Sequence, residues 1–296
     1  MNNNCWAELA AVKKRFGKTV ALDGVDMEVR HGELFALLGP NGAGKTTAIS
    51  LLLGLRRPDA GSVRLFGKSP LEVEARRQIG VMMQEVALPP ELRVRELIDL
   101  AASYYPAPLT PNAAMELTRT MPLAKRPYGR LSGGQKRQAQ FAMAVVGRPK
   151  LLFLDEPTVG LDQQAREMVW AVLREVVRAG SSIVLTRHYL EEAEALADRV
   201  AVLAKGRVIA SGTVSEMRAV VVRKRISCSS SLIAEDIGTW PGVESVRRDQ
   251  QGLHIVTNNA EDVVRRLLAA DGDLQELEVR RAGLAEAFAE LTQEAA

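Results

Sequence analysis

The stretch that decides the fold of the N-terminal part is "ELFALLGPNGAGKTT", residues 33–47. Its first half is a near-continuous apolar run of strand length, which is typical of a strand buried on both faces of a parallel sheet. A glycine-rich turn follows, and a helical pattern then runs over residues 45–55. Residues 39–46 match the pattern G-x4-G-K-[ST] in full, so the sequence predicts a phosphate-binding loop between a strand and a helix.

The residue types in this loop indicate how it would hold a nucleotide. Glycines let the backbone N–H groups of residues 42–46 turn inward around a β-phosphate at the start of a helix. The Lys45 ammonium can reach the β- and γ-phosphates, the Thr46 hydroxyl suits Mg2+, and Thr47 is placed to contact the α-phosphate. A glycine-rich turn without a ligand is the alternative. The predicted nucleotide-binding residues here are Gly39, Pro40, Asn41, Gly42, Ala43, Gly44, Lys45, Thr46 and Thr47.

Two adjacent carboxylates end a second apolar run, "LLFLDEP" at residues 151–157. Because the run predicts a buried strand, Asp155 would emerge at the sheet edge where the phosphate loop lies, and we expect it to help hold Mg2+. Glu156 follows directly, so its side chain leaves the strand in another direction. We predict that it activates the attacking water as a general base. Two acids that begin a turn before Pro157 are the alternative.

Apolar runs alternate with helical patterns over the first 220 residues, which indicates an α/β domain. Residues 8–30 and 61–66 alternate apolar and polar positions instead, which predicts an antiparallel sheet beside the main one. Residues 91–147 show helical patterns and no convincing strand. We therefore expect a mixed sheet core, an antiparallel β subdomain and a helical subdomain over about residues 88–147.

The order of strand and helix patterns in the sequence changes after about residue 222. Strand and helix patterns follow in the order β-α-β-β-α-β, with a hairpin around residues 250–252 and an amphipathic helix within residues 260–272. This order resembles a split βαβ, ferredoxin-like unit. A final helical pattern, "GLAEAFAELT", closes the chain. We predict two domains, an α/β domain over residues 1–220 and a small α+β accessory domain over residues 221–296.

Composition narrows the protein class. With 47% hydrophobic and 25% charged residues, the 296-residue chain is typical of a soluble globular protein. The net charge of +3 neither favours nor excludes nucleic acid on its own. Cys5 and Cys228 lie far apart without neighbouring metal-ligand residues, so we expect free thiols in a reducing compartment.

No apolar run reaches the roughly 18 residues that span a bilayer, and the N-terminus is not typical of a signal peptide. Any membrane part would therefore belong to another polypeptide.

The stretch "RLSGGQKRQ", residues 130–138, presents serine and glycines at the start of a predicted helix, which is the composition of a second anion-binding site. Together with the phosphate loop and "LLFLDEP", its "LSGGQ" resembles the signature motif of the ATP-binding subunit of ABC transporters. Further family motifs follow in order over residues 7–220. They are matched by Phe16 before the loop, Gln84 in "VMMQE", Asp162 in "VGLD" and His188 in "LTRH".

The resemblance implies a role for each of these residues. Phe16 would stack on adenine, although the family more often has tyrosine there. Gln84 would contact Mg2+ or the attacking water and sense the membrane partner. His188 would contact the γ-phosphate, and Asp162 would link two sites across a dimer. The γ-phosphate of a second subunit's ATP would be bound by the signature residues Ser132, Gly133, Gly134 and Gln135.

Three of these residues also have a structural alternative: Gln84 as a surface residue, His188 as a structural histidine and Phe16 as part of the core.

The resemblance further implies that ATP and Mg2+ are the cofactors and that an integral membrane permease is a partner. It also implies a second ATP-binding subunit, or cassette, which a homodimer would supply. It places the chain at the cytoplasmic face of a bacterial cell membrane and favours export. A non-transport ABC ATPase that acts on nucleic acid or ribosomes is one alternative, although a single cassette with nearly balanced charge favours no nucleic acid partner. A P-loop kinase is the other alternative, and it would leave "LSGGQ" unexplained.

Overall fold

The computed structural model describes residues 5–84, 86–187, 190–220, 224–249 and 252–281. These residues divide into two compact units, with the break after Val214. Neither unit contains, within the described residues, a helix long and apolar enough to cross a membrane. The boundary that we predicted at residue 220 therefore falls at the end of helix α8 (Val214–Val220), which begins where the first unit ends.

A six-stranded mixed sheet forms the centre of the first unit. The strand order is β5-β6-β7-β3-β8-β9, and all neighbouring pairs are parallel except β8 with β9. Every residue of β3 and β6 is buried, as the continuous apolar runs predict. The bounds are β3 Leu34–Leu38, β5 Ile79–Met82, β6 Leu151–Asp155, β7 Ser182–Arg187, β8 Arg199–Ala204 and β9 Arg207–Thr213.

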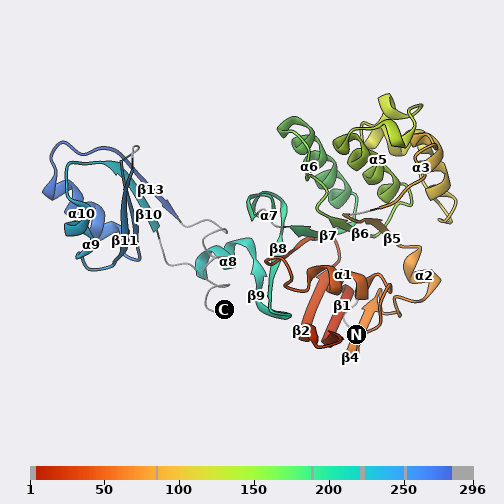
Figure 1. The fold of residues 1–296 in the computed structure, drawn as a ribbon, viewed down its shortest axis with the longest axis horizontal. Helices are drawn as coiled ribbons and strands as arrows, with labels where there is room; N and C mark the ends of the chain where they lie inside the picture. Colours follow the sequence, from red (N-terminus) through yellow and green to blue (C-terminus); the bar gives the residue numbers. More distant parts are fainter. Residues whose placement is uncertain (1–4, 85, 188–189, 221–223, 250–251, 282–296) are drawn as a thin grey trace. The chain divides into compact units, whose positions relative to one another are not determined.

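An antiparallel sheet and helix α1 (Lys45–Leu52) share a core with one face of the central sheet. Its order is β2-β1-β4, with bounds Cys5–Phe16 for β1, Thr19–Arg30 for β2 and Ala60–Leu65 for β4. Figure 1 shows α1 and this sheet on one side of β5, β6 and β7. The short helix α2 (Val73–Arg76) leads from this sheet toward β5. The predicted antiparallel β subdomain is confirmed.

Helices cover the other face of the central sheet. Leu173 and Val176 of α6 (Gln163–Arg178) pack in one cluster with strand residues that include Leu152 and Ile183. Helix α7 (Leu190–Leu196) follows β7. Figure 1 shows α6 on the same side of the strands as helices α3 and α5.

The segment between β5 and β6 is helical, as predicted, and has a core of its own. Within this stretch the described residues form α3 (Val94–Ala102), α4 (Pro111–Leu117) and α5 (Gly133–Val145), with 3-10 turns at Met121–Leu123 and Tyr128–Arg130. Tyr105 ties this segment to the central sheet, because its hydroxyl donates to the Ile79 carbonyl at 3.0 Å. The helical segment thus starts and ends next to the strands that carry the predicted site.

After α8, the described residues of the second unit form a four-stranded antiparallel sheet with helices α9 and α10, in the predicted order β-α-β-β-α-β. The strands lie in the order β11-β12-β10-β13, and helices α9 and α10 share a core with one sheet face. Leu267 of α10 is buried in this core, whereas its neighbour Leu268 is 55% exposed. The final predicted helix lies outside the described residues. The bounds are β10 Lys224–Ser229, α9 Ala234–Gly238, β11 Val243–Asp249, β12 Gly252–Thr257, α10 Ala260–Ala270 and β13 Gln275–Arg281.

Candidate functional site

The phosphate-type loop connects β3 to α1 and depends on two glycines with positive φ. A Cβ atom on Gly39 would lie 2.4 Å from the Leu203 carbonyl oxygen, and one on Gly44 would lie 2.5 Å from that of Ala21. Real Cβ atoms do not come this close, so both positions require glycine. Gly44 also precedes the first helical residue, Lys45, which brings the loop to the N-terminus of α1. The strand, loop and helix that the sequence predicts are therefore in place.

Lys45 points back across the loop. Its Nζ donates to the carbonyl oxygens of Gly39, at 2.6 Å, and Pro40, at 3.0 Å. Burial lowers the pKa of this ammonium below its usual value, and the negative charges of Glu156 and Asp155 oppose that shift. The Lys45 ammonium therefore lies within the electrostatic field of the predicted base Glu156 and the predicted metal ligand Asp155.

Asp155 and Glu156 lie at the carboxyl end of β6, and both are buried. Asp155 pairs in register with Thr186 of β7, whose hydroxyl donates to Asp155 Oδ1. The Glu156 backbone has a φ of 52°, which is unusual for a residue with a side chain. This turn of the chain sends Glu156 away from the direction of the strand, as predicted. The contact with Thr186 was missed by sequence reasoning, because it depends on the register of β6 with β7.

One cavity of about 230 Å³ brings the predicted residues together. Of the predicted loop residues, Asn41, Gly42, Gly44, Lys45, Thr46 and Thr47 line it, whereas Gly39, Pro40 and Ala43 do not. Gln84, Asp155 and Glu156 also contribute to the lining. Thr19, Val20 and Ala21, at the start of β2, complete the lining. The structure thus joins at one cavity residues that lie more than a hundred positions apart in the sequence.

The cavity offers oxygen ligands that suit Mg2+. Thr46 provides a hydroxyl, Gln84 an amide carbonyl and Asp155 a carboxylate, and all three line the same cavity. No cluster of three His, Cys, Asp or Glu residues that could hold a metal occurs among the described residues. The set therefore fits an ion that takes its remaining ligands from nucleotide oxygens and water, and it does not fit a resident metal held by the protein alone.

Gln84 also belongs to a second hollow, a groove of about 730 Å³ in the helical segment. The groove runs beside Val86, Ala87 and Leu88 to Tyr128 and to the first turns of α5. Arg137 of α5 donates to the Met83 carbonyl at 3.1 Å, which fastens this helix next to Gln84. One exposed glutamine side chain therefore borders both the phosphate-loop cavity and the groove.

The signature residues begin α5 as predicted. Ser132 is the N-cap: its Oγ accepts from the Gln135 backbone N–H at 3.3 Å, and Gln135 Oε1 accepts from the Ser132 N–H at 3.2 Å. Arg126 adds a hydrogen bond to Gln135 Oε1 at 3.0 Å. Ser132 and Gly133 are exposed, and a Cβ on Gly133 would meet no atom within 4 Å. None of the signature residues lines the phosphate-loop cavity of the same chain.

Three other predicted residues have separate surroundings. Asp162 caps α6, because its Oδ1 accepts from the Ala165 N–H at 2.8 Å. Phe16 ends β1 beside Thr19, with the Arg56 guanidinium 4.8 Å from its ring centroid, and is not among the residues that line the cavity. His188 lies outside the described residues, so its predicted contact with the γ-phosphate stays a prediction.

Comparison with known proteins gives the site a family context. A family model described as ABC transporter matches residues 22–159, a span that contains the loop, Gln84, the signature helix and both carboxylates.

Over 210 residues the chain is 44% identical to the Nod factor export ATP-binding protein I of Burkholderia pseudomallei (strain 1710b), covering 68% of each chain. It is 37% identical over 296 residues to the daunorubicin resistance ATP-binding protein DrrA3 of Streptomyces coeruleorubidus, covering 95% of this chain and 93% of the relative. Among solved structures, a dimeric post-hydrolysis state of an ATP-binding cassette bound to ADP and Pi superposes with a TM-score of 0.64. It is 25% identical, and the match covers 70% of this chain and 98% of that one.

Proposed function

Because this chain belongs to the ABC transporter family, we propose that it couples ATP binding and hydrolysis to export through a separate permease in the membrane. Within the family it is an ATP-binding subunit of the exporter type and an ATP hydrolase. The family assignment favours transport over action on nucleic acid or ribosomes. Residues 1–220 would carry hydrolysis, residues 221–296 would form the accessory domain, and the chain would lie peripherally at the cytoplasmic face.

The phosphate loop would bind the triphosphate of ATP as the substrate. Backbone N–H groups at the start of α1 and the Lys45 ammonium supply positive charge toward the β- and γ-phosphates. Before ATP binds, Lys45 donates to two loop carbonyls, and phosphate oxygens would take over these hydrogen bonds. Because both arrangements satisfy the ammonium, the exchange costs little desolvation of the buried lysine.

Thr46, Gln84 and Asp155 would hold Mg2+ together with nucleotide oxygens, and the ion would neutralise charge on the β- and γ-phosphates. Thr186 fixes the Asp155 carboxylate by hydrogen bonding to its Oδ1. Glu156, buried and turned away from the strand, would accept a proton from the attacking water. His188 would orient the γ-phosphate.

A second copy of the chain would complete each ATP site. The exposed Ser132 and Gly133 present a hydroxyl, backbone N–H groups and the positive end of α5, but they do not line the cavity of their own chain. A homodimer would place this helix N-terminus on the γ-phosphate bound by its partner. Asp162 would link the two sites across the dimer. Shifting such a dimer from about 1% to 99% closed takes roughly 5.5 kcal/mol of differential binding, which two bridging nucleotides can supply.

The observation that carries the coupling is the position of Gln84 on both hollows. The groove between residues 86–88, Tyr128 and α5 would receive a helix of the permease, and Gln84 would report its presence to the water and metal beside Glu156. Gln140 and Tyr128, which both line the groove, are held in place by a hydrogen bond that Gln140 Nε2 donates to the Tyr128 hydroxyl at 2.8 Å.

The test is Ala87→Arg, which places a long charged side chain in the groove. We expect the purified variant to keep its basal ATPase rate, because Ala87 does not line the phosphate-loop cavity. In a pull-down from solubilised membranes it should recover at least tenfold less integral membrane protein than the parent chain. Leu100→Arg is the matched control, since Leu100 is 49% exposed on α3 and does not line the groove. Recovery of ribosomes or DNA without a membrane protein by the parent chain would overturn the proposal.

A further inference from the structure

A two-residue turn, Lys205 and Gly206, joins β8 to the edge strand β9. Ala204 pairs with Arg207 across this turn. Both turn residues have a positive φ, 46° and 77°, which is typical of tight two-residue β-hairpins. Residues 203–207 are all described, and none of them lines the phosphate-loop cavity. Any effect of the turn on the site must therefore pass through the residues that it contacts.

The end of β8 and the turn lie against the phosphate loop. The Leu203 carbonyl oxygen approaches Gly39 so closely that a Cβ atom on this glycine would lie 2.4 Å from it. Further along the loop, the Gly206 N–H donates to the Ala43 carbonyl oxygen at 3.1 Å. Neither Gly39 nor Ala43 lines the cavity. The turn therefore holds the loop through residues that leave its nucleotide-facing groups free.

Gly206 also holds the start of β2. Its carbonyl oxygen accepts from the Asp23 N–H at 2.8 Å. A Cβ atom on Gly206 would lie 2.9 Å from the Ala21 carbonyl oxygen and 3.2 Å from the Leu22 Cα atom, so this position requires glycine. Ala21 is one of the residues that line the cavity. The two backbone groups of one glycine thus connect the phosphate loop to the part of the lining that β2 provides.

An ion pair beside the turn fastens the same segment of β2. The Arg207 guanidinium donates to Asp23 Oδ2 from Nη2 at 2.6 Å and from Nε at 3.1 Å, and Lys13 Nζ lies 3.1 Å from Asp23 Oδ1. Hydrogen bonds from Arg207 and then from Lys13 lower the pKa of Asp23 below its usual value, so this carboxylate is charged at neutral pH. The Arg207 side chain is 69% exposed, so we expect the ion pair to contribute less than the backbone contacts of Gly206.

The connection matters because the two parts of the lining belong to different sheets. The phosphate loop follows β3 of the central sheet, whereas Thr19 and Ala21 belong to β2 of the antiparallel sheet. Under the proposed function the triphosphate binds to the loop, and the adenine stacks on Phe16, which pairs with Thr19. ATP can contact both parts only if their spacing fits the nucleotide. A spacing that is fixed before ATP binds increases affinity, because no binding energy is used to order the two parts.

We propose that the turn between β8 and β9 sets this spacing, and that Gly206 and Arg207 are positioning residues that favour a nucleoside triphosphate over inorganic triphosphate. Inorganic triphosphate, or tripolyphosphate, can bind to the loop but has no base to place beside β2. The inference rests on the proposed function, since it requires ATP to bind with its phosphates at the loop. It assigns part of the nucleotide selectivity to residues outside the lining of the cavity.

The experiment compares the affinities of the full chain for ATP and for tripolyphosphate by isothermal titration calorimetry, without Mg2+ so that no hydrolysis occurs. In Gly206→Ala the new Cβ atom pushes against the Ala21 backbone. We expect the affinity for ATP to fall about tenfold and the affinity for tripolyphosphate to change less than twofold. Gly67→Ala is the matched control, because Gly67 has a φ of 75° and a Cβ atom there would meet no atom within 4 Å. Its backbone strain is similar, but the ratio of the two affinities should not change.

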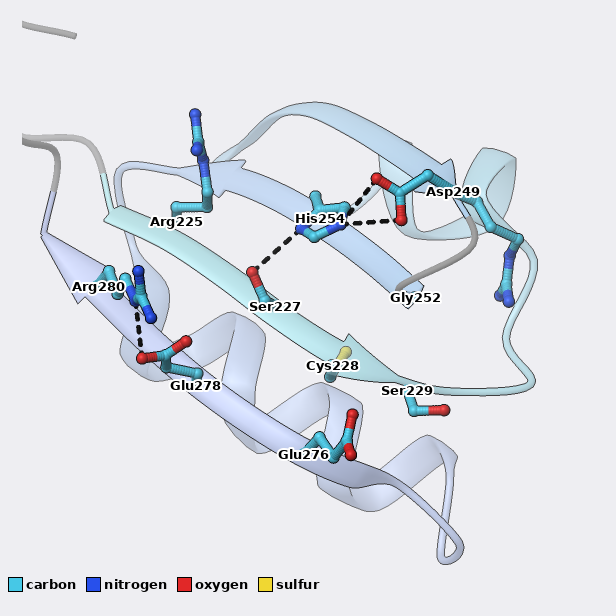
Figure 2. Close-up of a pocket in the computed structure, with 11 residues that line it drawn as sticks. Arg225, Ser227, Cys228, Ser229, Asp249, Gly252, His254, Glu276, Glu278 and Arg280 are labelled. Carbon is cyan, nitrogen blue, oxygen red and sulfur yellow. Dashed lines mark hydrogen bonds and ion pairs between the residues drawn. The ribbon is translucent and has the colours of Figure 1, made fainter. Parts of the chain in front are cut away.

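A second pair of variants tests the ion pair separately. Arg207→Ala should lower the ratio of ATP affinity to tripolyphosphate affinity about threefold, and Arg207→Lys, which keeps the charge, should retain the parental ratio. Arg280→Ala is the control. Figure 2 shows Arg280 paired with Glu278 on the C-terminal sheet, with Nε 2.7 Å from Oε1. Its removal takes away a comparable exposed ion pair and should leave the ratio unchanged.

The proposal is overturned if the parent binds ATP no more tightly than tripolyphosphate, or if Gly206→Ala weakens the binding of both ligands equally. It is also overturned if Gly67→Ala changes the ratio as much as Gly206→Ala does. Tripolyphosphate binding shows that a variant has kept a folded loop. If Gly206→Ala binds neither ligand, the comparison of Arg207→Ala with Arg207→Lys decides. A parent that binds neither ligand overturns the proposed function as well, whereas unchanged ratios in variants of an active parent overturn this inference alone.

Discussion

At the scale of single residues, the most consequential assignment is Glu156 as the base. Its φ of 52° and its burial place a carboxylate beside the phosphate loop, out of line with the strand that carries it. We expect Glu156→Gln to bind ATP with an affinity close to the parent's and to hydrolyse it about 10²- to 10⁴-fold more slowly, because the amide cannot accept the proton. Single-turnover ATPase assays and nucleotide binding measure the two effects separately.

The same variant should accumulate as an ATP-bound dimer in size-exclusion chromatography, since the bridging phosphate persists. Glu175→Gln is its control, because Glu175 is exposed on α6 and should leave the rate unchanged. A rate within twofold of the parent's in Glu156→Gln would refute the assigned base.

Single residues also show what the sequence could and could not predict. The loop, both carboxylates and the signature serine follow from motifs whose spacing dictates their chemistry. Thr186 belongs to no such motif, and only the register between β6 and β7 brings its hydroxyl to Asp155. The same limit applies to Asp162, whose hydrogen bond to the Ala165 N–H depends on where α6 begins.

At the scale of elements, periodicity predicts most of the strands and helices. Apolar runs identify β3 and β6, because strands buried on both faces need apolar side chains throughout. Strands β8 and β9 were not predicted. Strand β8 is apolar, but β9 pairs antiparallel to it at the edge of an otherwise parallel sheet. The residues of β9 are therefore only partly buried, and their sequence has no clear period.

The loop between β10 and α9 gives a prediction at this scale. Asp271 follows α10, and its carboxylate accepts from the Ser230 hydroxyl at 2.6 Å, the Ser231 N–H at 2.9 Å and the Asp273 N–H at 3.0 Å. The Ser230 hydroxyl, followed by the two backbone N–H groups, lowers the pKa of Asp271 below its usual value. A carboxyl group with a lowered pKa stabilises the fold above its unfolded pKa and loses that contribution as the pH falls through its folded value.

Asp271→Asn should therefore lower the melting temperature of the C-terminal unit at pH 7, because an amide replaces one acceptor oxygen by a donor. The difference from the parent should begin to shrink as the pH falls below about 4, the usual pKa of an aspartate, and should continue to shrink as the pH approaches the lowered pKa of the native carboxyl. Thermal unfolding followed by circular dichroism between pH 3 and pH 7 measures it. Asp273→Asn is the control, since its side chain is exposed and only its backbone N–H takes part. A difference that stays constant over this range would contradict the role of the charge.

At the scale of the whole molecule, our proposal places two halves of different ATP sites on one chain. The phosphate-loop cavity contains Lys45 and Glu156, whereas Ser132 is exposed elsewhere on the same unit. This predicts complementation between inactive variants. Lys45→Ala should lose ATP binding, and Ser132→Arg should bind ATP but lose hydrolysis. When the two are mixed, half of the dimers contain one chain of each kind, and each such dimer has one complete site out of two. Activity should recover to at most about one quarter of the parent's.

The control for this experiment combines two defects on the same half of the site. Lys45→Ala mixed with Glu156→Gln gives dimers in which each cavity contains one defect, so no complete site forms and no activity should return. If that mixture recovers as well, or if the Ser132→Arg mixture stays inactive although the chains exchange, Ser132 does not act on the partner's ATP. If ATPase activity returns only in the mixture of Lys45→Ala with Ser132→Arg, hydrolysis requires both chains of the dimer. The reason would be that the start of α5 in one chain acts on the γ-phosphate that the loop of the other chain binds.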